Sequence, residues 1–237
     1  MAKTKKQTPL ERSRGILGHA WRWALIAVSG LAGFLLFLIV LWSVINPPTT
    51  AYMISQSWRH SGVQHQWTAL ENMSPHIARS VVAAEDANFC QHWGFDIEAI
   101  KRAIADGGDR GASTLTQPTV KNVFLWHGRS YPRKVLEAVM TPVVEAVWTK
   151  RRIVEVYLNV AEFDRGVFGV HAASQRYFGT TPDKVTAVQA ARLAAILPAP
   201  QERSAAKPSK ALRKRAAAIM DGSATIGKDG RSICFES

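Results

Sequence analysis

Two adjacent carboxylates, Glu85 and Asp86, begin the segment of this sequence that is richest in side chains capable of chemistry. They open the run E-D-A-N-F-C-Q-H-W-G, which holds Phe89 and His92 and ends at Gly94, where the chain must turn. A pair of acids at a helix end is usually solvated surface. An aromatic ring and a histidine so close to the acids favour general acid–base chemistry instead.

Two further polar patches follow. The segment G-A-S-T-L-T-Q-P-T-V-K-N (residues 111–122) combines hydroxyls, amides and a lysine, which suit phosphate oxygens and sugar hydroxyls. Its simpler interpretation is a helix N-terminus capped by Thr116. The third patch, R-K-V-L-E, places Arg133 and Glu137 four residues apart on one helix face. A surface ion pair is the simpler interpretation there.

Helix signals dominate the chain that positions these patches. Ser74 and Pro75 are typical of a helix start. Asp96 can cap the next helix, and Thr186 with Gln189 forms a capping-box pattern. Together they predict a predominantly helical, all-α domain over residues 74–222. Gly222 is expected to end its last helix, which leaves residues 223–237 as a C-terminal tail.

An uncharged run over residues 23–45 precedes this domain. At a helical rise of about 1.5 Å per residue it would span roughly 34 Å, enough to cross a bilayer. Asn46 and Pro47 follow it, which is not the small-residue pattern of a cleaved signal peptide. The sequence therefore predicts a transmembrane helix and, at residues 46–73, an external stalk and first docking segment next to the membrane.

Charge sets the expected orientation and excludes one class of partner. Residues 1–22 carry six basic side chains and one acid, so this segment is expected to stay cytoplasmic. The rest of the chain, after Asn46, would then lie outside the cytoplasm. The net charge of +12 suits an anionic bilayer or a phosphate-bearing substrate. Neither a helix-turn-helix pattern nor zinc-ligand spacing supports binding of nucleic acid.

In this order the three patches resemble the peptidoglycan glycosyltransferases of glycosyltransferase family 51, which include the glycosyltransferase halves of class A penicillin-binding proteins. The stretches K-R-R-I-V-E-V-Y-L-N (150–159) and G-V-F-G-V-H-A-A-S-Q-R-Y-F-G (166–179) agree with it. The resemblance covers residues 81–200. It implies a lysozyme-like fold with two lobes, and inverting polymerisation of lipid II into β-1,4-linked glycan strands with release of undecaprenyl pyrophosphate.

The resemblance also implies roles for individual residues. Glu85 matches the base that activates the acceptor hydroxyl, and Glu137 matches a second catalytic glutamate near the departing phosphates. Substrate-binding roles are implied for Asp86, Phe89, His92, Ser113, Thr114, Gln117, Lys121, Asn122, Arg133 and Lys134. In contrast, Glu155, Tyr157 and Asn159 are expected to brace the fold.

The resemblance further implies partners and cofactors. The expected partners are lipid II, the nascent glycan strand and the lipid bilayer, with cell-division or elongation proteins as additional candidates. No organic cofactor is expected, and Glu137 is the candidate ligand for a divalent metal such as Mg²⁺ or Mn²⁺.

The sequence departs from the family pattern at two positions. Pro118 stands where a second glutamine is usual, and His171 stands where an acid is common. Proline in the first turn of a helix removes no hydrogen bond, so the fold should tolerate it. The lost amide motivates an alternative, a catalytically weakened scaffold of the cell-wall assembly complex. The other alternative is a lysozyme-like lytic enzyme, which also uses a glutamate in a cleft.

The chain has two cysteines, Cys90 and Cys234. The expected topology places both outside the cytoplasm, where thiols tend to oxidise. A disulfide between them is therefore predicted, with two unpaired thiols as the alternative.

Overall fold

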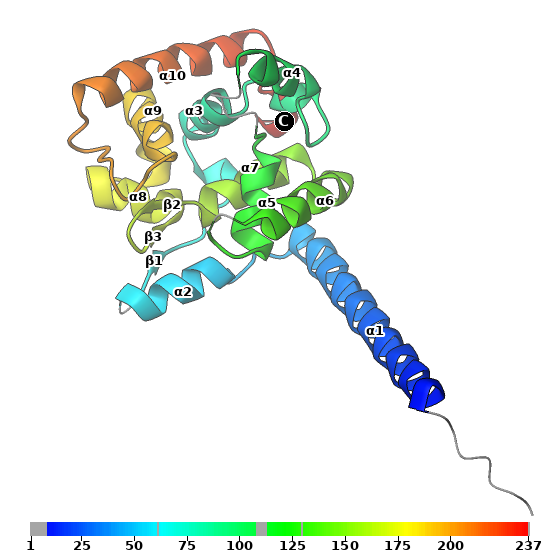
Figure 1. Ribbon diagram of the computed structural model, residues 1–237. Helices are drawn as coiled ribbons and strands as arrows, with labels where there is room; N and C mark the ends of the chain where they lie inside the picture. The colour runs from blue at the N-terminus through cyan, green and yellow to red at the C-terminus, as the bar shows by residue number, and fades with distance from the viewer. Residues whose placement is uncertain (1–8, 61, 108–112, 129, 237) are drawn as a thin grey trace, which may run out of the picture. The chain divides into compact units, whose positions relative to one another are not determined.

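The computed structural model describes residues 9–60, 62–107, 113–128 and 130–236 (Figure 1). The chain forms two compact units, Met1–Val44 and Ile45–Ser237. Helices account for most of the described chain, which confirms the predicted all-α class.

The first unit contains helix α1 (Pro9–Val44). Its part from Gly18 to Val44 is long and apolar enough to cross a membrane. The helix begins before the predicted span of residues 23–45 and ends one residue earlier. Helical structure satisfies every backbone hydrogen bond internally, as a segment inside a bilayer requires.

The second unit holds the candidate site. Its elements in chain order are α2 (Ala51–His60), β1 (Gln64–His65), η1 (Leu70–Asn72), α3 (Pro75–Glu85), η2 (Phe89–Gln91), α4 (Ile97–Ala105), α5 (Thr116–Phe124), α6 (Tyr131–Val147), α7 (Lys150–Val160), β2 (Glu162–Asp164), β3 (Val167–Phe168), α8 (Gly169–Phe178), η3 (Pro182–Lys184), α9 (Ala187–Ile196), α10 (Lys210–Lys228) and α11 (Ile233–Glu236).

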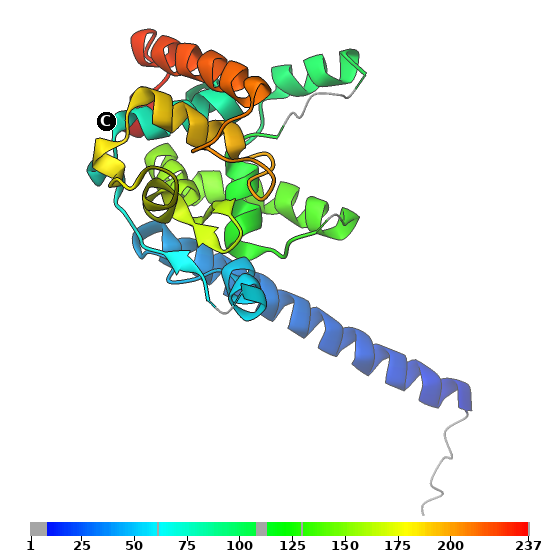
Figure 2. The ribbon, with the colours of Figure 1, turned by 90° about the vertical axis from the view of Figure 1, so that its left-hand side faces the viewer.

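Within this unit the helices form two packed groups. Helices α3, α9 and α10 pack on one another, and α5 packs against both α6 and α7. Figure 2 shows the first group above the second. A small sheet with strand order β1-β3-β2 lies beside α8; β1 pairs parallel to β3, and β2 pairs antiparallel to it.

Helix starts lie where the capping residues predicted them. Pro75 is the first residue of α3, and Ser74 occupies the N-cap position. The Asp96 side chain accepts a hydrogen bond from the backbone N–H of Ala99 at 2.8 Å, at the start of α4. Thr186 and Gln189 form the expected capping box of α9. Local side-chain chemistry is sufficient to set these boundaries.

Residues 46–73, predicted as a stalk and first docking segment, belong to the second compact unit. Strand β1 pairs with β3 through Gln64 and Val167. Asn159, which is fully buried, accepts from the backbone N–H of Thr68 at 2.8 Å and donates to its carbonyl at 2.9 Å. Asn159 therefore braces the fold, as predicted, and what it holds is the segment that leads into the domain.

The C-terminal region differs from its prediction. Helix α10 continues through Gly222 to Lys228, so the expectation that Gly222 ends the helix was wrong. A Cβ atom at Gly222 would lie 3.4 Å from the Cβ of Ala83, and one at Gly227 would lie 3.2 Å from the guanidinium of Arg79. The distance at Gly222 is ordinary van der Waals contact, and the closer contact at Gly227 is to the flexible end of the Arg79 side chain.

A disulfide joins Cys90 to Cys234, the pairing that the sequence predicted, with Cα atoms 5.7 Å apart. It connects η2, just beyond Glu85, with α11. Glu236 of α11 also accepts from Arg79 of α3 through both carboxylate oxygens, at 2.5 and 2.9 Å. These contacts secure residues 229–236 to the domain.

Candidate active site

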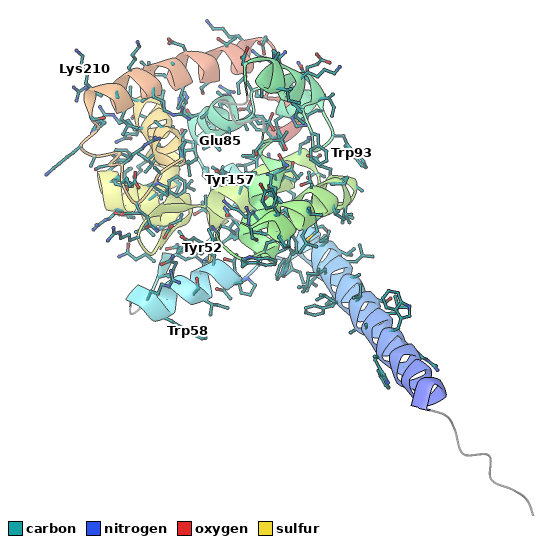
Figure 3. The ribbon with its side chains drawn as sticks, in the orientation of Figure 1. Tyr52, Trp58, Glu85, Trp93, Tyr157 and Lys210 are labelled. Atoms are coloured by element: carbon teal, nitrogen blue, oxygen red, sulfur yellow. A yellow bond between two sulfur atoms is a disulfide. The ribbon has the colours of Figure 1, made fainter. Side chains whose placement is uncertain are left out.

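Glu85 is the last residue of α3 and lines two cavities. The larger has a volume of about 500 Å³ and is also lined by Pro118, Lys121, Asn122 and Tyr157. Figure 3 shows Glu85 and Tyr157 close together, between α3 and α7. The smaller cavity, of about 200 Å³, is lined by residues that include Asp86, Ser113 and Thr114.

The Glu85 carboxylate is poorly solvated. Its Oε1 atom is buried and has no hydrogen-bond partner among the described residues. Burial raises the pKa of Glu85 above its ordinary value of 4.5, and the negative charge of Asp86 raises it further. The positive charges of Arg215 and Lys121 lower this pKa and limit the rise. A carboxylate in this environment is suited to accept a proton.

Asp86 connects the first two patches. Its carboxylate lies 2.9 Å from Nε2 of His92 and accepts from the backbone N–H of Leu115 at 2.9 Å. Phe89 is fully buried; its ring makes a T-shaped contact with the His92 ring, and the Lys150 ammonium lies 4.1 Å from its centroid. The full burial of Phe89 does not favour the expected contact with substrate and fits a role in holding the Glu85 segment. These three residues of the first patch hold the loop that follows Glu85.

The second patch is held by its own hydrogen bonds. The Thr114 hydroxyl donates to the Gly94 carbonyl at 2.6 Å, and the Thr114 N–H donates to Oε1 of Gln117 at 3.0 Å. Helix α5 begins at Thr116, whose hydroxyl donates to Glu145, so the interpretation of Thr116 as a cap was wrong. Ser113 is exposed beside the smaller cavity, where its hydroxyl is accessible to a ligand.

Gly94 provides the turn that the first patch predicted. Its φ is +84°, and a Cβ atom there would lie 2.9 Å from the Thr141 side chain. The backbone conformation and the close approach to α6 both require glycine at this position. This turn brings the Gly94 carbonyl to the Thr114 hydroxyl and so joins the first patch to the second.

Helix α5 presents Pro118, Lys121 and Asn122 to the larger cavity. Pro118 is the third residue of the helix, inside the first turn, where the fold was predicted to tolerate it. Burial lowers the pKa of Lys121, whereas the negative charges of Glu137 and Glu85 raise it. Lys121 is thus the cation on which both predicted catalytic glutamates act.

Glu137 occupies a different environment on α6. It is 3 % exposed, and its two oxygens accept from Nη1 of Arg133 at 2.6 Å and from Nζ of Lys134 at 2.5 Å. Arg133 also donates to the Gly128 carbonyl at 2.9 Å, and Nζ of Lys134 lies 3.5 Å from Oγ of Ser113. Because the Arg133 and Glu137 side chains are largely buried, the interpretation as a surface ion pair was wrong. Glu137 lines neither cavity of Glu85 and positions the two cations.

Comparison with known proteins identifies the family of this chain. A family model described as transglycosylase matches residues 52–224, most of the chain. The chain belongs to the transglycosylase family.

Individual relatives cover most of the chain as well. A biosynthetic peptidoglycan transglycosylase of Jannaschia sp. (strain CCS1) is 52 % identical over 231 residues, which cover 98 % of this chain and 97 % of the relative. One from Caulobacter vibrioides is 44 % identical, covering 83 % of the chain and 87 % of the relative. The corresponding protein of Escherichia coli O127:H6 is 45 % identical, covering 77 % of the chain and 80 % of the relative. These relatives confirm the family that the motifs indicated.

Several cavity residues of this transglycosylase were not predicted to contact a ligand. Tyr157, expected to brace the fold, lines the larger cavity. Its burial and the negative charge of Glu85 raise its pKa well above the ordinary value. The far wall contains Tyr52, His127 and Glu162, which lie outside the motifs. These three residues are far apart in the sequence, so their spacing could not predict that they line one cavity.

Two further residues singled out in the sequence are Glu155, expected to brace the fold, and His171, which stands where the family commonly has an acid. The Glu155 carboxylate accepts from the backbone N–H of Leu70 at 3.1 Å and pairs with Arg152, so it braces the fold as predicted. The ring of His171 lies 3.4 Å from the Thr68 hydroxyl, and we have no physical account of why histidine replaces an acid there.

Proposed function

We propose that this protein is a peptidoglycan glycosyltransferase that polymerises lipid II into β-1,4-linked glycan strands. The observation that carries the proposal is the environment of Glu85, a partly buried side chain whose buried Oε1 atom has no hydrogen-bond partner among the described residues, at a cavity that Lys121 also lines. Membership of the transglycosylase family supports the same chemistry.

In the proposed step, Glu85 removes the proton of the acceptor 4-hydroxyl. The hydroxyl oxygen forms a bond to the anomeric carbon of the donor, on the face opposite the pyrophosphate. The bond between that carbon and the pyrophosphate oxygen breaks, and its electron pair leaves with undecaprenyl pyrophosphate. The raised pKa of Glu85 makes the carboxylate a stronger base than an exposed glutamate.

Cations are needed where negative charge develops on the departing pyrophosphate. Arg133 and Lys134 are held by Glu137 at 2.6 and 2.5 Å, and Lys134 approaches Ser113 beside the smaller cavity. Lys121 lies within the electrostatic reach of both glutamates. We infer that these three cations hold the donor phosphates while Glu85 acts on the acceptor.

The expected Mg²⁺ or Mn²⁺ at Glu137 stays a prediction that the residues present do not favour. Both oxygens of Glu137 already accept from cationic side chains. Within the described chain, no group of three or more His, Cys, Asp or Glu side chains could hold a metal ion. The proposed step therefore relies on protein cations.

The proposed location is the outer face of the inner membrane. The apolar helix Gly18–Val44 is a candidate single-pass anchor, and the basic residues before it favour a cytoplasmic N-terminus. The disulfide between Cys90 and Cys234 is consistent with an oxidising compartment such as the periplasm. Both features support placing the active site where lipid II is polymerised.

The test is incubation of the purified full-length protein with lipid II, using Glu85→Gln protein prepared identically as the control. We expect glycan polymer from the wild type and none from the variant. Cleavage of preformed glycan strands without polymer would identify a lytic enzyme. Absence of both activities, with lipid II still bound, would identify a scaffold.

A further inference from the structure

The larger cavity has a wall that the family motifs do not provide. Tyr52 comes from α2, His127 from the loop after α5, Glu162 from β2 and Gln201 from the loop after α9. Figure 3 shows Tyr52 on the α2 side of the domain, with Tyr157 and then Glu85 beyond it. The wall therefore lies in the same cavity as the proposed base and is formed by separate parts of the chain.

Glu162 is the centre of a hydrogen-bond cluster in this wall. Its Oε2 accepts from the Tyr52 hydroxyl at 2.6 Å and from Nε2 of Gln201 at 3.0 Å, and its Oε1 accepts from the Gly166 N–H at 3.3 Å. These contacts fix the position of the carboxylate at the cavity. Carboxylates and amides arranged in this way are suited to bind neutral hydroxyl and amide groups.

His127 adds a neutral polar group to the same wall. Its ring is stacked on Tyr52, with centroids 3.3 Å apart and planes 14° apart. Burial, together with the charges of Lys121 and Arg133, lowers the pKa of His127 to about 3, so the ring is neutral at physiological pH. Its Nδ1 atom is buried and has no hydrogen-bond partner among the described residues. A buried nitrogen of this kind needs a partner, and a bound ligand can supply one.

Charge distinguishes this wall from the cationic side of the site. Glu162 and Glu202 contribute negative charge to the larger cavity; of the three proposed phosphate-binding cations, Lys121 lines this cavity and Arg133 and Lys134 do not. A phosphate would be repelled by these carboxylates. A sugar ring offers hydroxyl and acetamido groups for hydrogen bonds, and an apolar face for the aromatic rings.

We infer that Tyr52, His127 and Glu162 form a subsite that binds an N-acetylated sugar ring of the substrate and determines specificity for it. The inference rests on the proposed function and extends it to residues outside the motifs. His127 supplies a hydrogen bond to the sugar, and Glu162 orients Tyr52 and accepts from the ligand. These residues bind and position the sugar; they do not take part in proton transfer.

The decisive variants are His127→Phe, which keeps an aromatic ring beside Tyr52 and removes both nitrogens, and Glu162→Gln, which keeps the size of the side chain. Loss of one neutral hydrogen bond should raise KM for lipid II about tenfold and leave kcat within about twofold. Tyr177→Phe is the matched control, because that hydroxyl donates to the Phe163 carbonyl and Tyr177 does not line this cavity. We expect its kinetics to be unchanged.

A binding measurement separates this inference from the proposed activity. Glu85→Gln protein is titrated with a lipid-free disaccharide of N-acetylglucosamine and N-acetylmuramic acid, and binding is followed by NMR. We expect binding that His127→Phe weakens about tenfold, which is the effect of one lost hydrogen bond. If the disaccharide bound but the wild type did not polymerise lipid II, the sugar subsite would stand and the proposed glycosyltransferase activity would be refuted.

Two results would overturn the subsite. One is polymerisation with unchanged KM in folded His127→Phe and Glu162→Gln proteins. The other is disaccharide binding that neither variant weakens. Circular dichroism and the melting temperature establish that each variant is folded, and if His127→Phe does not fold, the Glu162→Gln result decides alone.

Discussion

Glu85 and Glu137 are both glutamates on helices, the first partly buried and the second 3 % exposed, yet their surroundings are opposite. Glu85 has an oxygen without a hydrogen-bond partner among the described residues and lines two cavities. Both oxygens of Glu137 accept from cations, Arg133 and Lys134. Burial of a carboxylate therefore leads to two functions. Glu85 can still accept a proton, whereas the hydrogen-bonding oxygens of Glu137 hold two cationic side chains in place.

The largest expected effect is on the proposed reaction. Glu85→Gln keeps the shape of the side chain and removes the base, so kcat should fall about 10²–10⁴-fold, the usual contribution of a general base. Lipid II binding should remain, because the cations are untouched. Polymerisation assays and binding titrations measure the two quantities. Near-full polymer synthesis by the variant would refute the assignment of Glu85.

A disulfide secures the Glu85 side of the site, because Cys90 lies on the segment that follows Glu85. The Glu137 side is held by ion pairs instead. Replacing both Cys90 and Cys234 by alanine should lower the free energy of unfolding by about 2–4 kcal/mol. Denaturant titration measures this loss. A reducing agent should destabilise the wild type similarly and leave the double variant unchanged. If the two proteins were equally stable, the C-terminal segment would have no part in securing this side.

The same substitution should change stability in opposite directions at the two glutamates. Glu137→Gln leaves Arg133 and the half-exposed Lys134 without their shared carboxylate, and should cost roughly 2–3 kcal/mol, somewhat less than breaking a fully buried pair. Glu85→Gln removes a desolvated charge whose Oε1 atom has no hydrogen-bond partner in the described part of the chain. At neutral pH it should leave stability unchanged or raise it.

The pH dependence sharpens this contrast. Burial raises the folded-state pKa of Glu85 above its ordinary value of 4.5. The stability that Glu85 contributes is therefore present below pH 4.5 and is lost as pH rises through the raised pKa. Any gain from Glu85→Gln should appear at neutral pH and disappear in acid. Melting temperatures of both variants across pH measure it, and a gain of equal size at every pH would contradict the raised pKa.

The smallest effect is expected at Pro118, which lines the larger cavity from the first turn of α5. Pro118→Gln should change the free energy of unfolding by less than about 1 kcal/mol, since neither a core group nor a cap is lost. It restores the amide usual in the family, so activity should be equal or higher. A large fall in activity would show that the cavity of this enzyme is adapted to proline. Thermal melts and polymerisation assays decide between these outcomes.

Local sequence determined the features that depend on neighbouring residues. Asp96 and Thr186 set helix starts because a capping side chain acts on backbone groups within one turn, and Pro75 begins α3 because its fixed φ suits the first helical position. The uncharged N-terminal run predicted α1 by length and composition. The motifs also predicted Glu85 and the cations near Glu137, because their order identifies the family.

Tertiary structure decided which of these residues are accessible. Phe89 and Ser113 come from the predicted patches, yet Phe89 is fully buried and Ser113 is exposed beside a cavity. Gly222 has the chemistry of a helix end, but the packing of α10 on α3 extends the helix through it. Tyr52, His127 and Glu162 meet in one wall from distant parts of the chain. Contacts of this range depend on how whole elements pack, and that information is absent from any local run of residues.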